Sequence, residues 1–128
     1  MSIARDTTAA NIKPLAGAVV RRYTPGAAVA AGEVVSLQSD GYVDPSDSTS
    51  AADEVIGIAV KAAAAAGDPK IDVVVLGPIV CLTGATPGET VFNSTTAGEP
   101  SESAAGNNTA VGYAESTTVL FVLPEHLA

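Results

Sequence analysis

One short pattern occurs twice in this chain. Gly-Glu-Val-Val at 32–35 is matched by Gly-Glu-Thr-Val at 88–91, an offset of 56 residues, and Val-Ile-Gly-Ile-Ala at 55–59 is matched by Ala-Val-Gly-Tyr-Ala at 110–114, an offset of 55. Each pair of landmarks encloses a polar loop and is followed by an apolar segment. Two copies are too few for a solenoid. We therefore expect an all-β fold, a small β-sandwich or barrel with a pseudo-twofold internal duplication.

The segments around these landmarks have the alternation and turn residues of strands. Asp40-Gly41 is a tight-turn dipeptide between two apolar runs, which predicts a hairpin. Gly57 interrupts a strand where a bend or another backbone needs the space. The most apolar stretch, 71–84, predicts a central strand bent at Gly77-Pro78. The alanines at 62–66 fit either a loop or one short helix.

Composition limits the size of the core. Of the 128 residues, 47% are hydrophobic, but the chain has only two Phe, three Tyr and no Trp. Such a core is built mainly from Val and Ala, which suits a thin sandwich or barrel. The length is that of one domain.

Charge divides the chain into two parts. Residues 1–22 hold four basic residues against one acid, a net charge of +3, and residues 23–128 hold two lysines against 13 acids, a net charge of −11. We expect an extended basic N-terminal arm (1–22) on a single acidic β domain (23–128). The arm suits an acidic protein surface, while nucleic acid is excluded because the body repels phosphate. The alternatives are an arm that is solvated or folded back on its own body.

Residues for chemistry are scarce. The only His, His126, lies near the end of the sequence, Cys81 lies in an apolar run, and no glycine motif for phosphate is present. The polar loop at 44–54 lacks the ligand order of a calcium site. We expect no catalytic residue, metal or cofactor, and no enzyme. No apolar run is long enough for a membrane span or a signal peptide, so we expect a soluble product of a cytoplasm.

The combination of "VAAGEVVSLQSDGYV", "VIGIAV", "VVVLGPIVCLTG", "TPGETVF" and "TAVGYAES" resembles the capsid cement, or decoration, proteins of tailed bacteriophages, over roughly residues 23–123. The resemblance implies a virion protein on the outer capsid surface, made in the host bacterial cytoplasm, that clamps neighbouring major capsid subunits. It also implies self-association, with a trimer favoured. As a hypothesis, the capsid-binding residues are the basic residues of the arm: Arg5, Lys13, Arg21 and Arg22. Strand edges at 18–23 would add to a sheet of the capsid or of a neighbouring copy, and deletion of residues 2–17 would leave the body folded.

An alternative function belongs to a different class. A phage tail or fibre accessory, or a β-sandwich adhesion module, would bind a cell surface or a glycan. Sugar recognition usually needs aromatic faces, and this chain offers Tyr23, Tyr42 and Tyr113 if they cluster on one surface.

Overall fold

The structure, a computed structural model, describes residues 3–49, 51 and 53–124, and these form an almost entirely β fold. The expected all-β class is confirmed. One short 3-10 helix (η1) spans Ala9–Asn11. The strands are β1 (Ala4–Arg5), β2 (Lys13–Pro14), β3 (Val19–Tyr23), β4 (Val34–Leu37), β5 (Val43–Pro45), β6 (Val55–Ala59), β7 (Ile71–Val80), β8 (Leu82–Thr83), β9 (Thr90–Phe92), β10 (Ala110–Ala114) and β11 (Val119–Val122).

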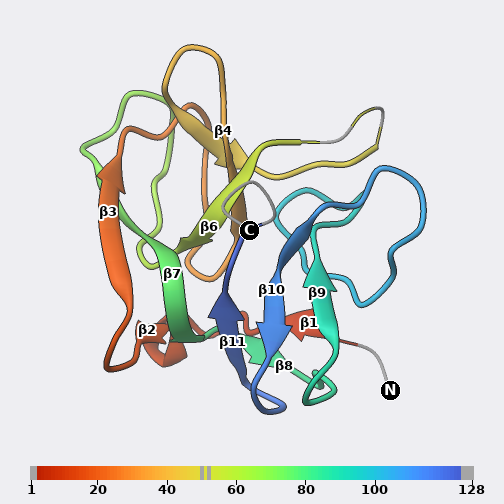
Figure 1. The fold of residues 1–128 in the computed structure, drawn as a ribbon. Helices are drawn as coiled ribbons and strands as arrows, with labels where there is room; N and C mark the ends of the chain where they lie inside the picture. Colours follow the sequence, from red (N-terminus) through yellow and green to blue (C-terminus); the bar gives the residue numbers. More distant parts are fainter. Residues whose placement is uncertain (1–2, 50, 52, 125–128) are drawn as a thin grey trace.

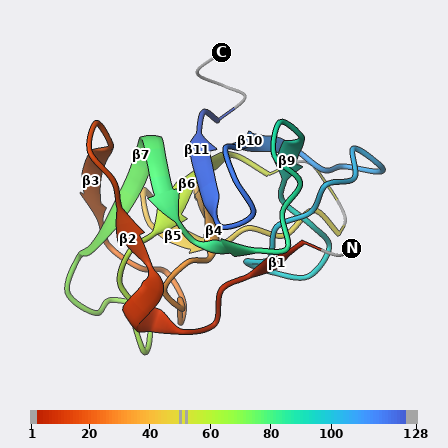
Figure 2. The same cartoon turned by 90° about the horizontal axis from the view of Figure 1, so that it is seen from below.

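A single curled sheet carries most of the molecule. Its order is β5-β4-β6-β7-β11-β10-β9, and β2 and β3 pair with β7; β1 and β8 form a separate two-stranded sheet. The long strand β7 is the centre, because β6 pairs with its first half and β11 with its second half (Figure 1). Viewed from below, β3, β7, β11, β10 and β9 form an arc across one side (Figure 2).

The internal repeat is present in the backbone. β4 pairs with β6 and β6 with β7, while β9 pairs with β10 and β10 with β11. Equivalent atoms make equivalent hydrogen bonds: Gly32 N donates to Ala59 O at 2.7 Å, and Gly88 N donates to Ala114 O at 2.8 Å. We call β4, β6 and the first half of β7 the first copy, and β9, β10 and β11 the second copy.

The glycine of the middle strand has the same role in both copies. A Cβ built on Gly57 would lie 1.9 Å from the carbonyl oxygen of Val74, and one on Gly112 would lie 1.9 Å from that of Phe121. Each glycine therefore allows a backbone of the neighbouring strand to approach closely, as the sequence predicts for Gly57.

The two copies are not buried equally, so they are not related by the expected twofold. Ile58 opposes Val74 in the first copy, and Tyr113 opposes Phe121 at the equivalent place in the second. Ile58 and Val74 are buried in the core that the two copies share, whereas Tyr113 is 39% exposed. A twofold would give equivalent residues the same surroundings.

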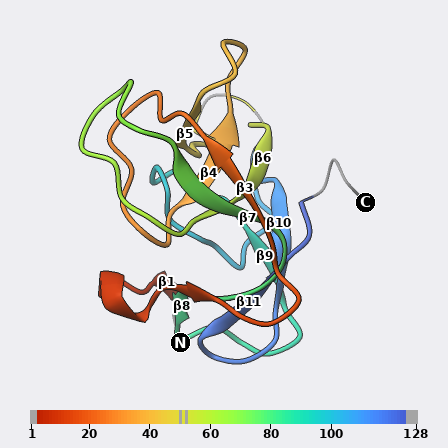
Figure 3. The ribbon, with the colours of Figure 1, turned by 90° about the vertical axis from the view of Figure 1, so that its left-hand side faces the viewer.

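The expected arm is extended, but it is not separate from the body. β1 pairs with β8, and β2 and β3 follow one edge of β7, from Lys13 opposite Val80 to Tyr23 opposite Ile71. Figure 3 shows β3 alongside β7. Ile12 is buried in the core. The domain boundary predicted after Arg22 therefore falls inside β3. We expected deletion of residues 2–17 to leave the body folded, but this deletion would remove Ile12 from the core and β2 from the sheet.

The predicted hairpin turn and the predicted strand bend lie at Gly41 and Gly77, as expected. The β4–β5 hairpin turns at Asp40-Gly41, where Gly41 has φ +84°. Gly77 has φ +103°, and a Cβ there would lie 2.8 Å from the Cα of Ala18, so β7 bends there against the arm.

The alanines at 62–66, which the sequence allowed to be either a loop or one short helix, form a loop.

The two long polar loops meet through hydrogen bonds around a buried asparagine. Asn93 is fully buried; its side-chain amide donates to Ser46 Oγ at 2.8 Å, and its oxygen accepts from Thr109 N at 2.7 Å. Ser48 Oγ donates to Asn108 Oδ1 at 2.6 Å. These bonds hold the 44–54 and 93–109 loops together across the repeat.

Candidate binding surface

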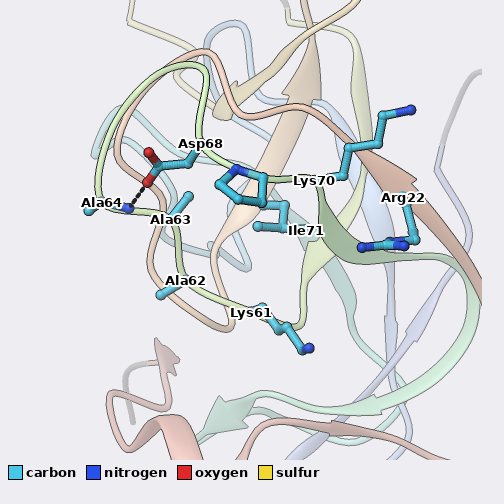
Figure 4. A pocket seen from close by; sticks show the side chains of 9 residues that line it. Arg22, Lys61, Ala62, Ala63, Ala64, Asp68, Lys70 and Ile71 are labelled. Carbon is cyan, nitrogen blue, oxygen red and sulfur yellow. Dashed lines mark hydrogen bonds between the residues drawn. The ribbon is translucent and has the colours of Figure 1, made fainter.

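Four of the six basic residues lie near one end of the β3–β7 ribbon, although Arg21, opposite Val73, and Arg22, opposite Asp72, point to opposite faces of it. Arg21 and Arg22 lie on β3, while Lys61 and Lys70 flank the loop between β6 and β7. Arg22, Lys61 and Lys70 line a cleft of about 380 Å³ (Figure 4). We call Arg21, Arg22, Lys61 and Lys70 the basic edge. On a chain of net charge −8, this end of the ribbon sets four basic side chains against the two carboxylates of Asp68 and Asp72, a local net charge of +2.

The loop that carries the two lysines is shaped by one carboxylate. Asp68 accepts hydrogen bonds from the backbone N of Ala64 at 2.9 Å and of Ala65 at 3.0 Å. Gly67 N also donates to Pro25 O at 2.9 Å. These bonds close the alanine run into a turn, because they satisfy backbone donors that a helix would otherwise use. The closed loop brings Lys61 and Lys70 to the same cleft.

The arginines of the basic edge are largely available to a partner. Arg22 Nε lies 3.5 Å from Asp72 Oδ1, and its side chain remains 68% exposed. Such an exposed ion pair contributes only about 0–1 kcal/mol, so Arg22 can exchange it for a carboxylate of a partner. Arg21 is exposed as well. Within the described residues β3 pairs with β7 alone, which leaves its outer backbone edge open.

The other two predicted residues lie elsewhere. Arg5 Nε binds Glu99 Oε2 at 2.9 Å, with the Arg5 side chain 16% exposed, and Arg5 Nη1 donates to Ala31 O at 3.2 Å. The guanidinium of Arg5 is therefore already paired within the protein, where it joins β1 to the 93–109 loop. Lys13 lies at the far end of β7, opposite Val80.

Sequence reasoning singled out Arg21 and Arg22 as capsid-binding residues, which stays a prediction, and it did not single out the two lysines. They stand at the two ends of the alanine run, and Asp68 near its end was the available signal for a closed turn. The arginines were singled out because residues 1–22 are basic while the rest of the chain is acidic. Lys61 and Lys70 join them only through the pairing of β3 with β7, which no local pattern contains.

In the described part of the chain, the residues considered for a metal site or for a nucleophile are not arranged for either role. No cluster of three or more His, Cys, Asp or Glu is placed there to hold a metal ion. Cys81 is fully buried, and burial, followed by the charge of Asp6, raises the pKa of its thiol far above the usual range. A thiol held protonated in this way is a poor nucleophile. His126 lies outside the described residues.

The tyrosines considered for an adhesion module lie on different elements. Tyr23 ends β3, Tyr42 follows the β4–β5 turn and Tyr113 is on β10. The aromatic pair found in the described residues is Tyr113 with Phe121, whose stacked ring centroids are 5.2 Å apart.

No helix in the described residues has the length and apolarity needed to cross a membrane. Comparisons with protein-family models, curated proteins and solved structures find no match to this chain.

Proposed function

We propose that this protein is a structural virion protein that binds the outside of an assembled phage head and clamps neighbouring major capsid subunits. The observation that carries the proposal is the basic edge, where four basic side chains outnumber the carboxylates of Asp68 and Asp72 on an otherwise acidic molecule. Charge complementarity of this kind selects an acidic protein partner and speeds the encounter with it. The resemblance of residues 23–123 to capsid cement proteins names the partner class.

The mechanism combines charge with strand addition. An extended acidic segment of a capsid subunit would bind along the open edge of β3, with its carboxylates near Arg21 and Arg22. Each exposed ion pair contributes only about 0–1 kcal/mol, so the affinity depends on backbone hydrogen bonds and on many equivalent sites. Because the site exists only on the assembled shell, binding stabilises that shell by mass action.

The test is co-sedimentation with expanded heads that lack the protein, titrated to saturation and counted per major capsid subunit. We expect a fixed symmetric ratio, and heads that survive more heat. The variant Arg21→Gln/Lys70→Gln removes two positive charges from exposed positions and is expected to weaken binding roughly tenfold or more.

The matched control is Ala97→Glu/Ala104→Glu, which makes the same change in net charge on an exposed loop of the second copy. This control should bind like the unmodified protein. Equal weakening by both variants would indicate an effect of net charge alone and would contradict a site at the basic edge. No binding to heads, or a handful of copies per particle, would overturn the head proposal and favour a tail, fibre or adhesion role.

A further inference from the structure

The sheet face that bears Tyr113 and Phe121 is apolar and uncovered in the described structure. Along β7 the residues alternate between buried Gly77 and Ile79 and the less buried residues Leu76, Pro78 and Val80; β11 alternates in the same way. We call the uncovered side the outer face. It contains these residues: Lys13, Leu15, Val19, Leu76, Pro78, Val80, Thr90, Tyr113, Glu115, Val119, Phe121 and Leu123.

Large exposed hydrophobic residues are concentrated on this face. Among the described residues, eight large hydrophobic side chains are exposed, and five of them belong to the outer face: Leu15, Val19, Leu76, Tyr113 and Leu123. The equivalent face of the first copy, with Ile58 and Val74, is buried in the shared core. A contiguous apolar surface of this kind marks an interaction site.

The two charged residues of the outer face stand in one row across the sheet. Lys13 pairs with Val80, Val80 with Val119, and Glu115 N donates to Val119 O at 2.8 Å. One row therefore reads Lys13, Val80, Val119, Glu115, with a cation at one end and an anion at the other. The face is electrically balanced, although the whole chain carries a net charge of −8.

This arrangement is self-complementary. A twofold axis that lies in the face, between β7 and β11 and parallel to them, places Lys13 of one copy over Glu115 of the other, and the reverse. The next row reads Leu15, Pro78, Phe121 and Tyr113. The same axis places Leu15 over the second Tyr113 and Pro78 over the second Phe121, so that apolar groups cover one another.

We propose that the outer face is an interface between two copies of this chain, packed face to face about this axis. This packing buries the apolar residues of the outer face and brings Lys13 of each copy against Glu115 of the other, which gives two ion pairs. It is independent of the basic edge, and it differs from the threefold association that the family resemblance implies.

The test measures the mass of the intact protein by sedimentation velocity over a concentration series. We expect a species of twice the 12.6 kDa chain mass. Lys13→Glu and Glu115→Lys each place like charges together twice in the dimer, and each should weaken dimerisation roughly tenfold or more. The double variant Lys13→Glu/Glu115→Lys should restore it, which a merely structural effect would not do. Ala97→Glu/Ala104→Glu, outside both the outer face and the basic edge, makes the same change in net charge as Lys13→Glu and should leave the dimer intact.

A second measurement identifies the contact itself. A zero-length carbodiimide reagent joins an amine to a carboxylate in direct contact. Lys13 and Glu115 of one chain are three strand spacings apart, about 14 Å, which is too far for such a link. We expect a Lys13–Glu115 cross-link between two chains, found by mass spectrometry in the dimer band. A monomer at every concentration, a trimer, or a dimer without charge-swap rescue would overturn the proposal.

Discussion

The two copies of the repeat have the same backbone and opposite surroundings. Both have a middle strand whose glycine lies against a neighbouring carbonyl oxygen. In the first copy the next position, Ile58, is buried, and in the second copy the equivalent Tyr113 is exposed. The two copies thus share their strand hydrogen bonds and their glycine contact, while equivalent side chains such as Ile58 and Tyr113, or Val34 and Thr90, differ in burial.

The connection after the middle strand differs as well. In the first copy it is the long loop 60–70, which carries Lys61 and Lys70; in the second it is the short turn 115–118. The two lysines of the basic edge therefore belong to a segment that only one copy has. A repeated scaffold that differs in its loops is a common way to place a binding site.

The largest difference between the copies is expected from truncating the equivalent side chains. Ile58→Ala opens a cavity in a fully packed site and should lower the free energy of unfolding by about 4 kcal/mol. Tyr113→Ala should cost less than about 1 kcal/mol in the monomer. Urea unfolding of both variants, at concentrations where the protein is monomeric, measures the contrast. Equal losses would mean that the outer face is not free in solution.

A smaller effect, equal in both copies, is expected from the two glycines. Gly57→Ala and Gly112→Ala each push a Cβ onto a backbone oxygen that cannot move without its strand, and each should cost about 3 kcal/mol. Gly106→Ala is the control, because no atom lies near its Cβ site and only its φ of +64° opposes the change, by about 1 kcal/mol. A neutral Gly112→Ala would contradict the equivalence of the strand pairings. The same urea titration gives all three values.

The smallest contrast concerns the strand ends that lead into the polar loops. Asn93 occupies the place in the second copy that Leu37 has in the first. Asn93→Ala leaves Ser46 Oγ and Thr109 N without their partner in the interior and should cost about 2 kcal/mol. Leu37→Ala, at a side chain that is 36% exposed, should cost less than about 1 kcal/mol. Thermal unfolding of the two variants compares them, and a larger loss for Leu37→Ala would refute the structural role of the amide.

Sequence reasoning succeeded where the signal was local. The hairpin at Asp40-Gly41, the close approach at Gly57 and the bend at Gly77 each follow from one or two residues whose conformations are restricted. The repeat could be recognised for the same reason, because each of its landmarks is a glycine with similar residues beside it in the sequence.

It failed where the partner is distant in the chain. The strand pattern at 19–23 does not show which strand these residues pair with. The arm was therefore expected to be separate from the body, whereas in the structure it pairs with β7. Arg5 was expected at a capsid surface as a basic residue of the arm, and its pairing with Glu99 could not be foreseen because the two residues are far apart in the sequence. Arg21 and Arg22 were named from the charge of the arm, and their binding to a capsid stays a prediction; Lys61 and Lys70 join them only through the folded sheet.

The central position of β7 has a consequence for synthesis. β3 leaves the ribosome roughly 50 residues before its partner, and at about 5–20 residues per second this delay is roughly 3–10 s. During that time Val19 and Val20 have neither a backbone partner nor a packed neighbour from β7. Every newly made chain therefore carries an unpaired strand with two adjacent valines for several seconds, and an unpaired strand edge of this kind favours aggregation until β7 has been made.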